Sequence, residues 1–279
     1  MTLDSRGYVS IAELVVYVPA FVLAIIICVR HGIRQTSGWI YTLILCLVRI
    51  VGSVCQLVTY SNPSVGLIQA YLVFDSVGLS PLLFATLGLL SRLVDWINTE
   101  RGPILQATHF RLVQLIITVG LILGIVGGVQ QGSSQSTTDT SPQPSSVSQA
   151  AIILYIVAFA ALVGILLLSF GYLSYVPSKE QSISAGVAIA LPLILVRLVY
   201  SALSTFTHSK TFSILGGNVG VFVGMAVVEE FLVIIIYLGL GFIVPKLQKG
   251  QQGEVGNGQW RQRRERPIKF TSLRGANLA

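Results

Sequence analysis

The sequence predicts an all-α fold: a bundle of seven transmembrane helices followed by a disordered cytosolic tail. The first supporting observation is composition, since 53% of the residues are hydrophobic and only 10% are charged, a balance typical of membrane proteins. The second is the presence of seven apolar stretches, each long enough to cross a bilayer, which takes about 20 residues. These stretches are too long and too continuous for the alternating strands of a membrane barrel.

The predicted spans lie within a transmembrane domain of residues 1–245 and are separated by polar segments. They cover residues 11–29, 38–60, 66–91, 110–129, 150–175, 183–206 and 217–244. The first apolar run is too long for the core of a signal peptide, and the polar residues before it carry both signs of charge. We therefore expect it to be retained as a membrane span.

Two polar segments have too little apolar surface to fold. Residues 130–148 are nearly all Ser, Thr, Gln, Gly and Pro, which predicts a flexible exposed loop. Residues 246–279 are rich in Gly, Gln and Arg and are predicted to be a disordered tail. The tail contains a basic cluster that we expect to contact anionic lipid. This cluster comprises Arg261, Arg263, Arg264, Arg266 and Lys269.

The distribution of Lys and Arg predicts the orientation. Seven spans place the two ends on opposite sides, so that one side carries only Arg6 and Lys210 whereas the other carries fourteen basic residues. Positively charged segments stay in the cytosol. We therefore expect an exterior or lumenal N-terminus and a cytosolic tail, in the plasma membrane or an endomembrane. Topology also explains the net charge of +7, so no nucleic-acid partner is expected.

Several ionisable residues fall inside the apolar stretches, where a charge costs roughly 3 kcal/mol and usually faces a protein interior. At 1.5 Å per residue they lie at similar depths near the bilayer midplane, with Glu13 closer to the outer surface. The ionisable residues near the midplane, together with one tyrosine, are the candidate ligand-binding residues. The set comprises Arg49, Asp75, Arg197, Tyr200, Glu229 and Glu230.

The spacing of polar residues predicts which helix faces point inward. A 4-3-4-3-4 spacing in the second span places six side chains on one face. These are Thr42, Cys46, Arg49, Ser53, Gln56 and Tyr60. A shorter stripe in the sixth span comprises Arg197, Ser201 and Ser204. Glu229 and Glu230 diverge by about 100° around the helix axis, so they cannot both point at one partner. We expect one ion pair between Arg197 and either glutamate, and a second between Arg49 and Asp75.

Three acids against two arginines leave one carboxyl without a cationic partner, a situation that favours its neutral form in a buried site. Such a group acts as a proton donor, a proton relay or a ligand anchor. The candidate catalytic residues are therefore Asp75, Glu229 and Glu230. The alternative is that the charges pair only to fix the order of the helices.

Several chemistries lack their sequence signals. The Asp-Asp-x-x-Asp motif of magnesium-dependent prenyltransferases is absent, and so are P-loop and dinucleotide fingerprints. The three histidines are scattered, and the three cysteines suit buried small apolar positions. No metal and no cofactor are therefore expected. A rhodopsin-like receptor is disfavoured because the last span has no Asn-Pro-x-x-Tyr pattern.

Five stretches carry a family resemblance. They cover residues 37–57 with Arg49, 78–92, 121–128, 191–206, and the Met-Ala-Val-Val-Glu-Glu-Phe run of residues 225–231. In these the chain resembles a fungal family of seven-span membrane proteins known only as a domain of unknown function. The resemblance implies a fungal source and an integral membrane protein, but no activity. A looser likeness in size and span number to fungal lipid-translocating exporters and small membrane terpene cyclases is an analogy.

The leading functional hypothesis is the binding or transport of a lipid-like small molecule at the midplane cluster, in contact with membrane lipids. A membrane enzyme such as a terpene cyclase is the alternative, and whether the chain is an enzyme is left open. There a protonated candidate acid would start the reaction, and aromatic rings would stabilise cations. Those rings are Phe74, Phe222 and Phe231. A structural or scaffolding membrane protein is the second alternative.

Overall fold

The computed structural model describes residues 4–31, 38–61, 64–101, 105–134, 145–207 and 219–246. All regular elements in these residues are helical, and no strand occurs among them, which confirms the predicted all-α fold. Seven helical segments of the described chain are long and apolar enough to cross a membrane.

Most spans are a single helix, whereas the third and the seventh are built from consecutive pieces. The helices are α1 (Ser5–His31), α2 (Trp39–Ser61), α3 (Val65–Val77), α4 (Leu79–Arg101), α5 (Ala107–Ser134), α6 (Ser146–Phe170), the short 3₁₀ helix η1 (Leu173–Tyr175), α7 (Ser178–Phe206), α8 (Val219–Phe222), the π-helical turn η3 (Val223–Val227) and α9 (Val228–Ile243). The third span comprises α3 and α4, and the seventh comprises α8, η3 and α9.

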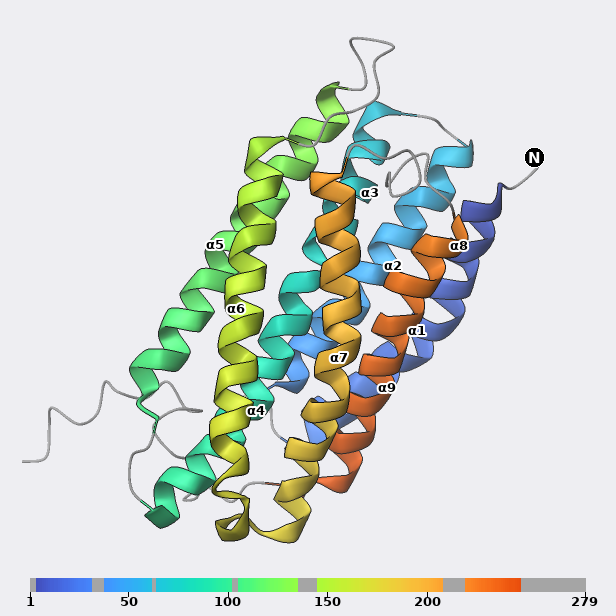
Figure 1. The fold of residues 1–279 in the computed structure, drawn as a ribbon. Coiled ribbons are helices and arrows are strands. Elements are labelled where there is room, and N and C mark those ends of the chain that lie inside the picture. The colour runs from blue at the N-terminus through green and yellow to red at the C-terminus, as the bar shows by residue number, and fades with distance from the viewer. Residues whose placement is uncertain are drawn as a thin grey trace, which may run out of the picture.

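Seven helices form a closed ring in the order α1, α2, α3, α5, α6, α7 and α9, and α9 contacts α1 again (Figure 1). The helix α4 lies inside this ring, against α2, α5, α6 and α7. Accordingly 78% of an apolar 18-residue segment of the third span is buried, against at most 50% of the corresponding segment in any other described span. The break at Gly78 therefore takes the chain from the ring into the centre of the bundle.

The surface of the bundle is apolar while its interior holds aromatic and polar groups. Val15, Leu112 and Ile189 are 59–67% exposed, whereas Tyr17 and Tyr237 are almost fully buried. A soluble protein would bury such aliphatic side chains, but lipid solvates them. The distribution fits an integral membrane protein.

Three predicted spans end at different places from those expected. The predicted third span ends at residue 91, but α4 continues to Arg101 because Arg92 and Asp95 are buried in the bundle instead of lying in a loop. The predicted fifth span reaches residue 175, but α6 ends at Phe170 and is followed by η1. The helix α5 also runs through Ser134, into the predicted polar loop. Residues 135–144 and the tail after residue 246, with its basic cluster, lie outside the described residues.

Candidate functional site

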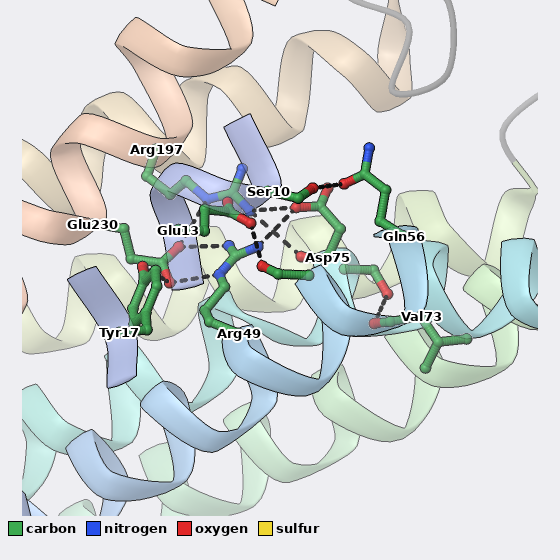
Figure 2. Close-up of polar contacts among 11 residues, drawn as sticks. Ser10, Glu13, Tyr17, Arg49, Gln56, Val73, Asp75, Arg197 and Glu230 are labelled. Atoms are coloured by element: carbon green, nitrogen blue, oxygen red, sulfur yellow. Dashed lines mark hydrogen bonds and ion pairs between the residues drawn. The ribbon is translucent and has the colours of Figure 1, made fainter. Parts of the chain in front are cut away.

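Arg49 stands at the centre of a buried ion network to which α2, α3, α7 and α9 contribute (Figure 2). Its Nε and Nη2 atoms donate to the two carboxylate oxygens of Glu230, at 2.6 and 2.5 Å. Its Nη1 atom donates to Oδ1 of Asp75 at 3.0 Å. The planar fork of arginine suits this two-oxygen contact. Gly78 makes room for it, since a Cβ atom there would lie 2.7 Å from Arg49 Nη2.

Arg197 joins the same network from α7. Its Nη2 atom lies 3.4 Å from both Oδ1 and the carbonyl oxygen of Asp75, and its Nε atom lies 3.7 Å from Oε2 of Glu230. Arg49 therefore contacts Asp75, and Arg197 contacts an acid of the seventh span, as predicted. The prediction of two separate pairs is wrong, however, because Arg49 also binds Glu230. Two guanidinium groups and two carboxylates share one site.

Glu230 is the inward-facing glutamate, and a π-helical turn explains the choice. Glu230 is 1% exposed and also accepts a hydrogen bond from the Tyr17 hydroxyl at 2.9 Å. Glu229 is only partly buried, and its Oε2 atom has no hydrogen-bond partner among the described residues. The turn Val223–Val227 holds one residue more than an α-helical turn, which rotates the following helix by about 100°. In an uninterrupted α-helix continued from α8, Glu229 would stand at the angular position that Glu230 now holds.

The first helix contributes a polar stripe that the sequence analysis did not assign to the site. Glu13 is buried and accepts a hydrogen bond from Ser53 at 2.6 Å, so its side chain faces the interior of the bundle. Ser10, one turn earlier, donates to Gln56 at 2.5 Å. With Tyr17 these residues repeat at spacings of three and four, the signal that revealed the stripe in the second span.

A cavity of about 40 Å³ borders the network between α3, α5, α6 and α7. Asp75 and Arg197 belong both to its wall and to the ion network. Most other polar groups in the wall are hydroxyls. They come from Ser76, Ser148, Tyr155, Tyr200, Ser201, Ser204 and Thr205. The cavity extends toward the end of the bundle where α1 begins, because Gln131, Ser148 and Thr205 lie at that end of their helices (Figure 1).

The predicted site residues divide into three groups. Asp75, Arg197 and Tyr200 line the cavity, and Arg49 and Glu230 lie behind them in the network, whereas Glu229 does neither in the described residues. The predicted stripe of Arg197, Ser201 and Ser204 lies along the cavity wall. The aromatic candidates are not among the lining residues. Phe231 packs against Tyr17, Phe222 against Tyr200 and Phe74 beside Gly52.

A second buried ion pair lies toward the other end of the bundle, where the sequence predicted a loop. Arg92 of α4 donates to both carboxylate oxygens of Glu180 in α7, at 3.0 and 2.5 Å. It also donates to the carbonyl oxygen of Pro245, just after α9, and its guanidinium lies over the Trp39 ring. Arg92 thus ties the ends of three spans together. No sequence pattern indicates this pair, because both residues lie at the polar ends of apolar stretches.

The arrangement offers hydrogen bonds and paired charges. No group of three or more His, Cys, Asp or Glu residues that would hold a metal ion occurs in the described part of the chain. At the cavity, a carboxylate, a guanidinium and several hydroxyls stand close together. Such a wall suits the recognition of a small polar group.

A family model with the description "Domain of unknown function (DUF7702)" matches residues 3–247. The chain belongs to this family. The DUF7702 match covers the seven apolar helical segments of the described chain, the ion network around Arg49, the pair of Arg92 and Glu180, and the cavity. These are therefore features of the family's domain in this chain. No curated protein and no solved structure matches the chain.

Proposed function

We propose that this chain binds, and by binding helps to move, a lipid-like small molecule whose polar group enters the cavity beside Asp75 and Arg197. One observation carries the proposal: these two residues belong at once to the cavity wall and to the buried ion network. Ionisable groups at membrane depth are costly, and where they border a cavity they commonly mark a ligand or ion pathway.

The size of the cavity decides which part of the molecule it takes. A volume of about 40 Å³ has room for a few water molecules, and not for an acyl chain or a ring system. The cavity therefore suits a polar group. The apolar body would lie along the aliphatic surface of neighbouring helices, where side chains such as Leu195 and Val199 are exposed.

The basic-residue asymmetry supports a cavity on the exterior or lumenal side. The cavity opens toward the end where α1 begins, which is the side with few basic residues. Access would then come from outside the cytosol, at the plasma membrane or an endomembrane, in a fungal cell as the sequence resemblance implies. Contact of the basic tail with anionic lipid belongs to the same proposal.

The enzyme alternative has less support from the geometry. Asp75 and Glu230 both accept hydrogen bonds from Arg49, a contact suited to carboxylates and not to acids that must give up a proton. Phe74, Phe222 and Phe231 do not line the cavity in which a cation would form. A purely structural role for the ion network is the remaining alternative.

The proposal is tested by filling the cavity without touching a charge. A Cβ atom on Gly124 would lie 3.5 Å from the Tyr155 hydroxyl, an ordinary contact, so Gly124→Val projects into the cavity with little strain elsewhere. Gly164 has open space around it, and Gly164→Val is the matched control. The full chain is purified from its host and its bound small molecules are identified by mass spectrometry. We expect an amphiphile enriched with the wild type and Gly164→Val but lost from Gly124→Val. Identical profiles for all three proteins would contradict the proposal.

A further inference from the structure

The charges around the cavity are balanced, which bears on the kind of polar group it accepts. Asp75 and Glu230 match Arg49 and Arg197 within hydrogen-bond or ion-pair distance. Glu13 lies beside this network, and the positive charge of Arg6 interacts electrostatically with Asp75. These two residues add one charge of each sign to the surroundings of the cavity. A ligand with a net charge would leave one buried charge without a partner, at a cost that disfavours binding.

Asp75 and Arg197 both line the cavity, and each keeps a hydrogen-bonding atom that the described residues leave unused. Every hydrogen bond from the described residues to the Asp75 carboxylate ends on Oδ1, which leaves Oδ2 as an acceptor. Arg197 donates to the described residues only through Nη2, which leaves Nη1 as a donor. The Tyr155 hydroxyl is buried in the wall and has no hydrogen-bond partner among the described residues.

We propose that the polar group recognised here is a neutral hydroxyl, so that the ligand is an alcohol with a large apolar body. This inference rests on the proposed function. A hydroxyl donates to Asp75 and accepts from Arg197 at the same time, and a cavity of about 40 Å³ accommodates it. The Asp75 carboxylate would repel a ligand carboxylate or phosphate. The Arg197 guanidinium would repel a ligand ammonium group. A zwitterionic lipid headgroup is neutral but larger than the cavity.

The apolar part of the wall agrees with such a ligand. Leu79, Ala151 and Ile152 line the cavity among the hydroxyls, so the carbon that bears the ligand hydroxyl would lie against aliphatic side chains. Gly124 leaves the space beside the Tyr155 hydroxyl open. The wall thus offers paired hydrogen bonds at one point and apolar contact around it.

The test compares four probes of one chain length: radiolabelled hexadecan-1-ol, hexadecyl methyl ether, hexadecanoic acid and hexadecylamine. Saturable binding is measured with the full-length protein in phosphatidylcholine nanodiscs, and empty nanodiscs provide the background. Hydroxyl-bearing detergents are avoided because they would compete. We expect the alcohol to bind about tenfold more tightly than the ether, which cannot donate to Asp75, a ratio that corresponds to one lost hydrogen bond. The acid and the amine should bind more weakly than the alcohol.

The outcomes separate this inference from the proposed function. If the ether, the acid or the amine binds as tightly as the alcohol and Gly124→Val abolishes that binding, the cavity is a site but hydroxyl recognition is wrong. If no probe binds saturably, or if Gly124→Val and Gly164→Val bind every probe as the wild type does, the proposed function fails as well. Loss of alcohol binding in Gly124→Val alone, with the expected order of probes, supports both.

Discussion

Arg49 holds more of the ion network than Arg197 does. It donates three hydrogen bonds of 3.0 Å or less, to Glu230 and Asp75, whereas the contacts of Arg197 with the same acids are 3.4 Å or longer. Because both acids are buried, each depends on nearby cations to offset its loss of hydration. The two arginines are therefore unequal, although the sequence places both within apolar stretches.

The first prediction follows from this inequality. Arg49→Leu should lower the free energy of unfolding by roughly 3–5 kcal/mol, because Asp75 and Glu230 lose their shorter ionic contacts. Arg197→Leu should cost less, since Arg49 still binds both acids. Thermal unfolding of the purified variants in detergent measures the difference. An Arg197→Leu variant at least as unstable as Arg49→Leu would contradict the stronger hold of Arg49 on the two acids.

The second prediction concerns the adjacent glutamates. Glu230→Gln removes the charge that faces both arginines and should destabilise the protein by roughly 3–5 kcal/mol. Glu229→Gln is the matched control one residue away and should change stability by no more than about 0.5 kcal/mol, because the described Glu229 carboxylate forms no ion pair. The same thermal assay applies. Equal losses in the two variants would contradict the inward orientation of Glu230.

At the scale of elements, glycines decide how closely the helices approach. A Cβ on Gly128 of α5 would lie 3.1 Å from the Val73 backbone, and one on Gly120 would lie 2.9 Å from the Tyr155 ring. Gly120, Gly124 and Gly128 recur every four residues, a spacing of small residues that lets helix backbones approach closely. Gly220 and Gly224 repeat this spacing in the seventh span, but Gly224 has open space around it and belongs to the π-helical turn.

The third prediction uses two glycines of α9. A Cβ on Gly241 would lie 2.7 Å from an Ile27 methyl group and 2.9 Å from the Trp39 indole nitrogen, whereas nothing lies within 4 Å of a Cβ on Gly239. Gly241→Ala should therefore cost about 1–3 kcal/mol through overpacking against α1 and α2. Gly239→Ala should be neutral or slightly stabilising, since alanine favours the helix. Thermal unfolding in detergent compares them, and an unaffected Gly241→Ala would argue against this packing.

At the scale of the whole molecule, the seven-helix fold was predictable because apolar length and composition alone identify membrane helices. Arg49, Asp75 and Arg197 were predictable as members of a buried polar cluster for the same reason, since each interrupts an apolar stretch. The choice of Glu230 was not, because a π-helical turn leaves no pattern in residue type. The pair of Arg92 and Glu180 was missed because it lies at polar span ends, where a buried charge and a solvated one look alike in sequence.

The fourth prediction concerns orientation, which follows from the fourteen basic residues on one side against two on the other. A reporter fused after Ala279 should be cytosolic. A glycosylation acceptor inserted within residues 135–144, between α5 and α6, should be modified in the secretory pathway. Glycosylation at the C-terminal fusion, with none at the inserted acceptor, would reverse the orientation and place the cavity opening on the cytosolic side.

The central claim is that Asp75 and Arg197 serve a ligand and not only the fold, and a combined variant separates the two roles. Removing both residues leaves the bidentate contact of Arg49 with Glu230 intact and charge-balanced. The measurement is thermal stability together with the amount of co-purified or added amphiphile for Asp75→Asn, Arg197→Met and the double variant. We predict that the double variant regains most of the stability that Arg197→Met and Asp75→Asn lose, yet retains no ligand. A double variant that regains stability and still binds the ligand at the wild-type level would contradict the claim and assign the network to structure alone.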